Sequence, residues 1–334
     1  MKKYQNNLKT QIISFFKLST LSKIKKILKL LGIKIFIYQI LYFFLSIIIK
    51  SKSYFLRGIF FDAQKSQSEL TIVKNKFNEK FILFTNDNII SKEMYVKEEF
   101  DLKKLKKTLH FLNKNKNIEH LYDIGANIGV ICIPAVKRGL VKKAYAVEPE
   151  SQNFELLKTN IVLNNLEEKI TPYNYALSSK DDEIIDMELA NDNSGDHRIK
   201  KLVKFNIHGE EKRKIIKVKT KKFDSLFNNL NSKNDLVWID TQGYEPIILS
   251  GAKKLIESKT PVVIEFWPYA LKRADLWTSM FKILKNFDFF VDLSNEDLFS
   301  DRINDNSLNK LKNGWEREQK GSYSLFTDLL LLRE

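Results

Sequence analysis

Short apolar runs alternate with amphipathic segments along the chain from residue 119 onward. Runs of roughly 4–8 apolar residues bounded by turn residues are typical of buried strands, and apolar positions spaced three and four apart are typical of helices. The runs predict strands over 120–125, 143–150, 169–179, 182–190, 214–220, 235–240, 261–268, 287–294 and 323–332. The segments between them predict helices over 127–139, 151–165, 223–230, 246–258 and 269–285.

Strands that alternate with helices form a parallel sheet with helices on both faces. The last two predicted strands have no clear helix between them, so we expect an antiparallel pair at one edge of the sheet. The predicted fold class is therefore α/β, a Rossmann-like, seven-stranded, mostly parallel sheet with an N-terminal helical extension.

The chain before residue 119 has a different pattern. Residues 81–86 (FILFTN) predict a short strand, and residues 96–113 predict a charged helix with one apolar side. We therefore expect three parts: a basic and apolar helical extension over 1–60, a lead-in region over 61–118 and the main α/β domain over 119–334.

The positive charge of the chain is concentrated at its N-terminus. The net charge is +15, from 56 lysine and arginine residues against 41 aspartate and glutamate residues. Residues 1–61 hold 12 of the basic residues and no acidic one, which leaves 44 basic and 41 acidic residues in the rest. Nucleic-acid-binding domains have basic stripes over their folded surface, so this distribution disfavours nucleic acid and favours a membrane surface.

Residues 21–35 (LSKIKKILKLLGIKI) place leucine and isoleucine on one helical face and lysine on the other, and an apolar run of 15 residues ends at residue 49. A spanning helix needs roughly 20 such residues. Three interpretations stay open: an interfacial membrane helix, a helical cap packed on the domain, and a spanning anchor. We expect a cytoplasmic protein, peripheral on the inner face of the membrane, with residues 21–50 making the contact.

The chain offers few metal ligands of the kind that zinc prefers. Its one cysteine is Cys132, and its four histidines have no spacing known for zinc sites. We therefore expect no disulfide framework and no metal, and a reducing compartment suits this cysteine content.

A glycine-rich turn follows the first strand of the main domain, with the sequence Asp123-Ile124-Gly125-Ala126-Asn127-Ile128-Gly129. Glycine allows close approach of the backbone to a ligand, and a helix opening after the turn would direct free N–H groups at it. The turn is neither GxGxxG nor a P-loop, which disfavours a dinucleotide or an ATP phosphate. The next strand ends in Glu148, whose carboxylate can bind both hydroxyls of a ribose.

Several blocks together resemble the FkbM-type methyltransferases, a branch of the class I S-adenosylmethionine (SAM) enzymes: LYDIGANIGV, AYAVEPESQNFELLKTN, YALS, VWIDTQGYEPIILSGA and VVIEFWP. The resemblance covers residues 119–268 and implies that 119–334 is a SAM-dependent methyltransferase domain. Two features differ from the common family pattern: Gln242 stands where glutamate is frequent, and the segment over 191–209 is long.

The resemblance also implies which residues bind SAM. The turn after the first strand would hold the amino-acid end, and Glu148 would take the ribose hydroxyls. Asn174 and Ala176 would flank the adenine, although Asn174 is equally explained as a turn residue. The implied cofactor residues are Asp123, Gly125, Ala126, Asn127, Gly129, Glu148, Asn174 and Ala176.

Three acids follow or end later strands. Asp240 and Glu265 end parallel strands, where ligands of open α/β sheets bind. The resemblance implies that Asp240 lies beside the transferred methyl group, and we expect Glu265 to bind substrate. Glu245 is either a catalytic acid or a charge that suits the first turn of a helix.

The insertion over 191–209 contains the polar stretch Asp192-Asn193-Ser194-Gly195-Asp196-His197-Arg198, which is suited to line an acceptor pocket. His197 is the best candidate for a general base because its ordinary pKa is near neutrality, and an exposed loop histidine is the alternative. We expect Asp196 and Arg198 to bind the acceptor, with Arg198 either gripping an anionic group or lying at the surface.

We therefore expect SAM-dependent methyl transfer to an oxygen. The resemblance implies that the acceptor is a sugar or another small or glycan molecule, such as a surface polysaccharide or a glycolipid. A nucleic-acid methyltransferase would share the fold, but its N-P-P-Y block is absent and IDTQGYE stands in its place. A non-catalytic, membrane-associated SAM-binding protein is disfavoured by the intact set of Asp123, Glu148 and Asp240.

Overall fold

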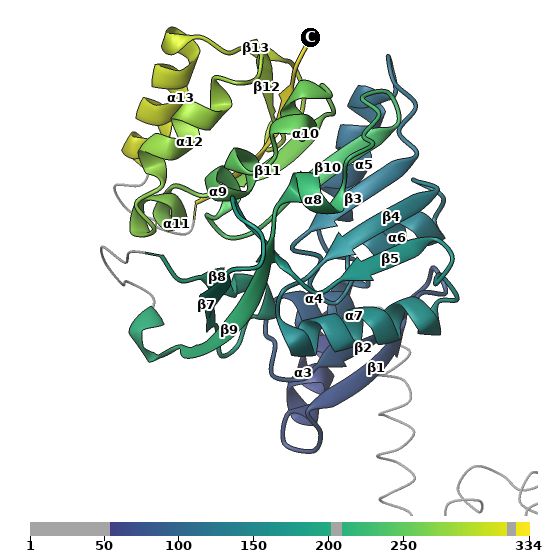
Figure 1. Ribbon diagram of the computed structural model, residues 1–334. Coiled ribbons are helices and arrows are strands. Elements are labelled where there is room, and N and C mark those ends of the chain that lie inside the picture. Colours follow the sequence, from purple (N-terminus) through teal and green to yellow (C-terminus); the bar gives the residue numbers. More distant parts are fainter. Residues whose placement is uncertain (1–53, 202–208, 319–324) are drawn as a thin grey trace, which may run out of the picture. The chain divides into compact units, whose positions relative to one another are not determined.

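The computed structural model describes residues 54–201, 209–318 and 325–334 (Figure 1). The chain divides into two compact units, Met1–Phe60 and Phe61–Glu334. Of the first unit only residues 54–60 are described, and they begin helix α3 (Tyr54–Gln64). The helix and membrane contact expected over 21–50 lie outside the described residues. None of the described helices is long and apolar enough to cross a membrane.

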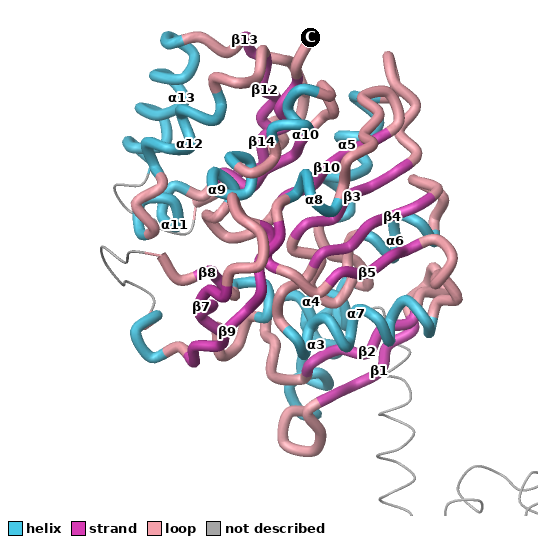
Figure 2. The backbone as a smooth tube through the Cα atoms, in the orientation of Figure 1, coloured by secondary structure: helices cyan, strands magenta, loops and turns pink. Residues whose placement is uncertain are grey.

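The second unit is built on a mixed central sheet (Figure 2). Its eight described strands are, in spatial order, β13 (Asp301–Arg302), β12 (Phe289–Asp292), β14 (Thr327–Leu332), β11 (Val262–Phe266), β10 (Asp235–Ile239), β3 (His120–Ile124), β4 (Lys143–Val147) and β5 (Ile170–Tyr173). The strands from β11 to β5 are parallel, whereas β14 is antiparallel to both β11 and β12. The α/β class is confirmed, but the expected count of seven misses β13, which is short, polar and exposed.

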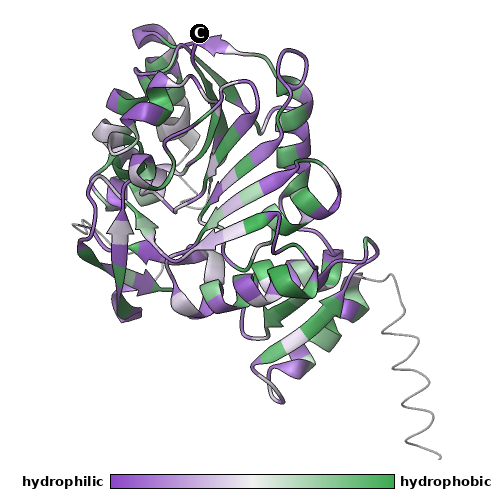
Figure 3. Cartoon of the chain, turned by 45° about the vertical axis from the view of Figure 1, so that its right-hand side comes forward, coloured by the Kyte–Doolittle hydropathy of each residue, from purple (hydrophilic) through white to green (hydrophobic). Residues whose placement is uncertain are grey.

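Helices cover both faces of this sheet. One face packs against α4 (Ile90–Lys97), α5 (Leu102–Leu112), α6 (Cys132–Lys137) and α7 (Ser151–Leu163). The other packs against α8 (Phe223–Leu226), α9 (Glu245–Ser250), α10 (Lys253–Glu257), α11 (Pro268–Arg273), α12 (Trp277–Leu284) and α13 (Asp305–Glu318). Successive strand residues face opposite sides, so Trp238 joins the first core while Val237 and Ile239 join the second. Figure 3 shows the hydrophobic residues along these central strands.

A smaller sheet lies beside the carboxyl ends of the parallel strands (Figures 1 and 2). Its four described strands are, in spatial order, β6 (Ala176–Leu177), β9 (Lys214–Lys221), β7 (Ile184–Leu189) and β8 (Arg198–Ile199). The strand expected over 169–179 is therefore two strands, β5 and β6, that belong to different sheets. The strands expected over 182–190 and 214–220 exist, but they build this second sheet.

The lead-in region packs against the main fold. It contains the hairpin of β1 (Leu70–Lys74) and β2 (Lys80–Phe84), followed by α4 and α5. Asn160 of α7 and Asn164, which follows the last residue of this helix, bind the backbone of β2. The side chain of Asn164 accepts from the N–H of Lys80 (3.0 Å) and donates to its carbonyl oxygen (2.7 Å). The helix expected over 96–113 begins only at Leu102, because Glu98 (φ 67°) and Asp101 (φ 48°) are left-handed.

Several other helices differ from their predicted bounds. The helix expected over 127–139 begins at Cys132, and those over 246–258 and 269–285 are each broken into two. The predicted antiparallel pair is confirmed as β12 and β14. The expectation of no helix between them is wrong, because α13 lies there, and its 14 residues are largely polar.

Candidate functional site

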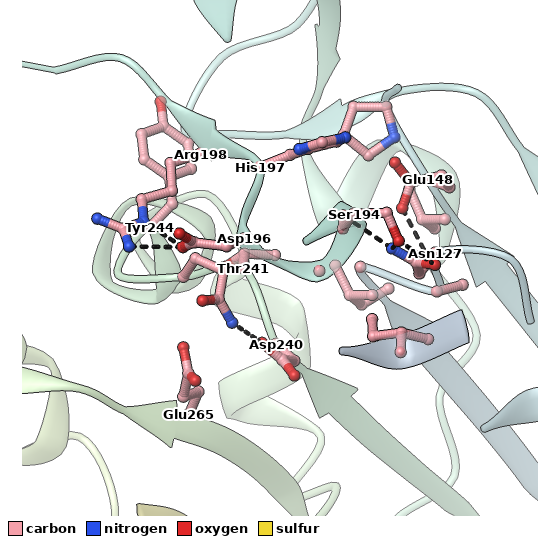
Figure 4. Close-up of a pocket in the computed structure, with 18 of the residues that line it drawn as sticks. Asn127, Glu148, Ser194, Asp196, His197, Arg198, Asp240, Thr241, Tyr244 and Glu265 are labelled. Atoms are coloured by element: carbon pink, nitrogen blue, oxygen red, sulfur yellow. Dashed lines mark hydrogen bonds and ion pairs between the residues drawn. The ribbon is translucent and has the colours of Figure 1, made fainter. Parts of the chain in front are cut away.

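The carboxyl ends of β3, β4, β10 and β11 border a cavity of about 610 Å³. The loop over 192–198 and the first turn of α4 complete its wall, so segments far apart in the sequence meet there (Figure 4). Among the described residues, no group of three or more histidine, cysteine, aspartate or glutamate side chains is arranged to hold a metal ion.

Gly125 directly follows β3 and lies against the end of β10. Its φ is +88°, and a Cβ atom there would collide with the backbone carbonyl oxygen of Asp240. Glycine is therefore required for the turn to lie this close to Asp240. Gly129 (φ +91°) has a packing role instead, since a Cβ atom there would meet Ile133 and Leu157, and it does not line the cavity.

Asp123 lies buried at the end of β3, in the cavity wall. Its Oδ2 accepts a hydrogen bond of 3.1 Å from the backbone N–H of Cys132, the first residue of α6. Burial raises the pKa of Asp123 to about 6. The helix thus begins well after the glycine turn, so its amino end binds this carboxylate rather than facing the cavity as expected.

Glu148 holds the turn from the end of β4. One carboxylate oxygen accepts from the N–H of Asn127 and the other from the N–H of Glu150, each at 2.9 Å. Each oxygen has a second lone pair, and Glu148 lines the cavity together with Ala126 and Asn127. Burial raises the pKa of Glu148 to about 8.

The loop over 192–198 is bonded to this turn. The Asn127 side-chain amide donates to the carbonyl oxygen of Ser194 at 2.9 Å, and the Ser194 hydroxyl donates to Asp87 at 2.6 Å. The backbone N–H of Asn88 donates to the carbonyl oxygen of Asp192 at 2.8 Å. The lead-in region therefore holds the loop over the glycine turn, a contact that no sequence motif signalled.

Asp240 lies in the cavity wall, close to the glycine turn. The side-chain amide of Gln242 donates to its Oδ1 at 2.7 Å. Burial, followed by the nearby charges of Asp328, Glu245 and Asp101, raises the pKa of Asp240 to about 8. Gln242, which stands where glutamate is frequent in the family, is therefore a hydrogen-bond partner of this carboxylate.

Glu245 is buried and does not line the cavity. Its Oε1 accepts from the N–H and the hydroxyl of Thr241, each at 2.9 Å, and from the N–H of Gly243 at 3.3 Å. It shapes the turn after β10, so the expected catalytic contact is not seen and Glu245 acts through this turn. Burial raises its pKa to about 7.

His197 lines the cavity but has an unusual pKa. Burial lowers this pKa to about 4, and Nδ1 accepts a hydrogen bond of 3.1 Å from the N–H of Ala190. The ring is neutral near pH 7, and with Nδ1 occupied its proton is on Nε2. The expectation of a base with an ordinary pKa is therefore wrong, as is the alternative of an exposed loop histidine.

Arg198 is buried, so the surface alternative is wrong. Its guanidinium binds Asp196 (Nε to Oδ1, 2.6 Å) and Glu210 (3.1 Å) and stacks 4.5 Å from the centroid of Trp267. Asp196 also pairs with Arg213. Arg198 is thus held by two carboxylates that it shares with other arginines, which argues against the expected grip on an anionic acceptor.

Asn174 does not line the cavity. Its amide donates to the carbonyl oxygens of Glu148 (2.9 Å) and Pro149 (3.2 Å), so it fixes the turn after β4. Ala176 and Glu265 line the cavity as expected. Lining residues that sequence reasoning did not single out are Ile89, Tyr175, Tyr244, Trp267 and Phe326.

A model of the methyltransferase FkbM domain family matches residues 123–291, half of the chain. A search of curated proteins found no match.

The chain is also similar to several solved structures. One is an FkbM methyltransferase from Methylobacillus flagellatus KT (13% identity, 83% of this chain and 59% of that chain, TM-score 0.37). A second is P. horikoshii TYW2 in complex with MeSAdo (13% identity, 80% of this chain and 73% of that chain, TM-score 0.36). A third is the M. jannaschii tRNA m1G37 methyltransferase (15% identity, 80% of this chain and 58% of that chain, TM-score 0.36). Because these TM-scores are below 0.5, the family of this chain is identified from the family match alone.

Proposed function

The chain belongs to the FkbM methyltransferase family, and on that premise we propose that it methylates a hydroxyl oxygen of a sugar or of another small or glycan acceptor. SAM dependence follows from the family. The acceptor and the roles of individual residues are our proposal.

The residues around the glycine turn fit SAM. Glu148 lines the cavity, and beyond its bonds to Asn127, Glu150 and the side chain of Asn153 its carboxylate has a lone pair left to accept from a ribose hydroxyl. Gly125 and Asp123 both line the cavity, and the lack of a side chain at Gly125 lets the turn lie against the backbone of Asp240. We propose that these residues and Asn127 hold the cofactor, with Ala126 and Ala176 packed against it.

Bound SAM supplies an electrophilic methyl group on a sulfonium sulfur. The task of the protein is to hold an acceptor oxygen in line with the sulfur–carbon bond and to remove its proton. With SAM bound, the carboxylate of Asp240 would take the proton of the acceptor hydroxyl as that oxygen receives the methyl group. The single observation that supports this role is that Asp240 lines the cavity while its backbone lies against the Gly125 turn.

Features beyond Asp240 support a hydroxyl-bearing acceptor. The cavity lining also includes the carboxylate of Glu265 and the aromatic side chains of Tyr244, Trp267 and Phe326. Apolar faces with a few well-placed polar groups are typical of small-molecule sites. A sugar ring offers both hydroxyl donors and an apolar face.

Transfer of labelled methyl from SAM tests the proposal. Full-length protein is incubated with labelled SAM and, separately, with a panel of glycosides, a bacterial glycolipid fraction, tRNA and duplex DNA. We expect label in a sugar-containing acceptor and its loss in Asp240→Asn. Label in tRNA or DNA but in no sugar would overturn the proposed acceptor in favour of nucleic acid.

A further inference from the structure

Strand register aligns a row of carboxylates on one face of the central sheet. Asp123 of β3 pairs with Trp238 of β10, and Ile239 pairs with Ile264 of β11. Because side chains alternate along a strand, Asp240 and Glu265 lie next to each other on the face of Trp238. Asp328 of β14 is the register partner of Glu265. The row of carboxylates therefore crosses four neighbouring strands, from β3 beside the glycine turn to β14.

Glu265 differs from the other buried acids in this part of the molecule. It is 5% exposed and lines the cavity, Oε2 is wholly buried, and neither oxygen has a hydrogen-bond or ion-pair partner among the described residues. In contrast, Arg273 binds Glu188 at 2.8 Å and Lys104 pairs with Asp328 at 2.6 Å. Figure 4 shows Glu265 extending from its strand into the cavity, on the side of Asp240 and Thr241.

A buried carboxylate without a partner destabilises the folded protein. Glu245 also has a buried oxygen without a partner, but its other oxygen accepts three hydrogen bonds. Glu265 has neither oxygen satisfied and sits in a cavity wall. An unsatisfied group in that position is suited to bind a donor group of a ligand.

The charges around Glu265 indicate which ligands fit. Burial, followed by Asp240, Glu245 and Asp328, raises the pKa of Glu265 well above its usual range. The charge of Arg198 offsets only part of this rise. Arg198 is itself paired with Asp196 and Glu210, and Lys104 is paired with Asp328 and Asp101. Neighbouring carboxyls that share protons can both donate to and accept from hydroxyls, and they repel an anion.

We infer that Glu265 is the acceptor-binding residue that holds the hydroxyl next to the one methylated, and that the acceptor is an uncharged sugar with neighbouring hydroxyls rather than an acidic one. The inference rests on the proposed function, since Asp240 is taken as the residue beside the reacting oxygen. Trp267 and Phe326, with ring centroids 6.5 Å apart in the same wall, offer an apolar surface for the ring of such a sugar.

Matched acceptors test this with the full-length protein. Methyl glycosides of glucose, galactose and mannose are compared with their uronic acid counterparts in the labelled-methyl assay, while calorimetry follows SAM binding. We expect at least one neutral glycoside to be methylated with a kcat/KM at least about tenfold above that of its uronate. Glu265→Gln should raise the KM of that glycoside about ten- to a hundredfold with little change in kcat, and narrow the gap to the uronate.

Thermal unfolding separates ligand binding from a structural role. Glu265→Leu replaces an unsatisfied buried polar side chain with an apolar one of similar size and should raise the unfolding midpoint by about 2–4 °C. Glu188→Leu removes a buried carboxylate that is paired with Arg273 and should lower it.

Three results would overturn the inference: preference for a uronate, an unchanged KM in Glu265→Gln, or SAM binding without methylation of any neutral glycoside. The first and third use the unchanged protein and do not depend on the variant. Failure of the unchanged protein to bind SAM would instead overturn the proposed function.

Discussion

Ser194 donates a hydrogen bond of 2.6 Å from its hydroxyl to Oδ2 of Asp87, a residue 107 positions earlier in the chain. Both side chains are buried. Asp87 also accepts from the backbone N–H groups of Ile89, Ile90 and Ser91, so it fixes the start of α4 at the same time. A carboxylate outside the family match of 123–291 therefore holds the loop that covers the glycine turn.

Loss of the Ser194 hydroxyl should loosen this loop and weaken SAM binding. Ser194→Ala removes the bond to Asp87 but leaves the carbonyl oxygen that Asn127 binds. We expect SAM affinity to fall about three- to tenfold, or about 0.6–1.4 kcal/mol, as measured by calorimetry.

The matched control for this change is Ser225→Ala, which removes a hydroxyl bonded to Asp181 at 2.8 Å outside the cavity wall. The control should bind SAM like the unchanged protein. Equal affinities in the two variants would contradict a role for Ser194 in the cofactor site.

Glu148 should make SAM binding depend on pH. Its pKa is raised to about 8 by burial, so the free protein has a mostly protonated carboxyl at pH 7. Ribose hydroxyls donate best to the ionised form, so SAM affinity should rise as pH increases from 7 to 9. Glu148→Gln should weaken binding about ten- to a hundredfold at pH 9 and flatten this rise.

Calorimetry across that pH range measures the effect, with Asp240→Asn as the control because its carboxyl has a similar pKa of about 8. The rise should survive in Asp240→Asn. An undiminished rise in Glu148→Gln would show that another group titrates.

Much of the central sheet is predictable from the sequence because its strands are buried on both faces. Runs such as Val262–Phe266 are entirely buried and consist almost wholly of apolar residues. The carboxyl ends of such strands meet at one edge of a sheet, which is why the sequence alone groups Asp123, Glu148 and Asp240. Elements with few apolar residues, such as β13 and α13, give no comparable signal.

Side-chain environments in the site depend on contacts between distant segments, and sequence spacing does not reveal them. The ordinary pKa of histidine predicts titration of His197 near neutrality, but burial lowers its pKa to about 4. Arg198 binds Glu210, a residue 12 positions away and just after the insertion over 191–209. Asn174 turns to the backbone of Glu148 and Pro149 because β5 ends before it and β6 begins in another sheet.

The basic N-terminal sequence should bind anionic membranes. Lys23, Lys25, Lys26 and Lys29 lie in a stretch without acidic residues, and each basic residue near an anionic surface adds about 1 kcal/mol at low salt. Replacing all four by serine should release the full-length protein from phosphatidylserine vesicles in a sedimentation assay.

The control variant removes the same number of positive charges from the second unit and should still bind the vesicles. It has serine in place of Lys142, Lys180, Lys217 and Lys253. Vesicle binding that is equal in both variants, or unaffected by salt, would contradict the electrostatic attachment.

Asp240 and His197 can be separated as bases by the pH dependence of the rate. A base must be deprotonated, so with Asp240 as the base kcat/KM for the acceptor should fall as pH drops through about 8, the pKa that burial and the nearby acids give it. With His197 as the base the fall would lie near pH 4. The measurement uses saturating SAM, so that the titration of Glu148 in the free protein does not contribute.

Asp240→Asn should lower kcat about a hundred- to ten-thousandfold, because the amide cannot take the proton. The limb of the pH profile near 8, that is, the fall in kcat/KM as pH drops through this value, should disappear in this variant. His197→Ala should retain that limb, since the neutral ring has its Nδ1 bonded to the N–H of Ala190 and its remaining proton on Nε2. SAM affinity measured in both variants controls for damage to the cofactor site. Full activity in Asp240→Asn, with the limb still present, would remove Asp240 from the mechanism and direct the search for the base to Glu265.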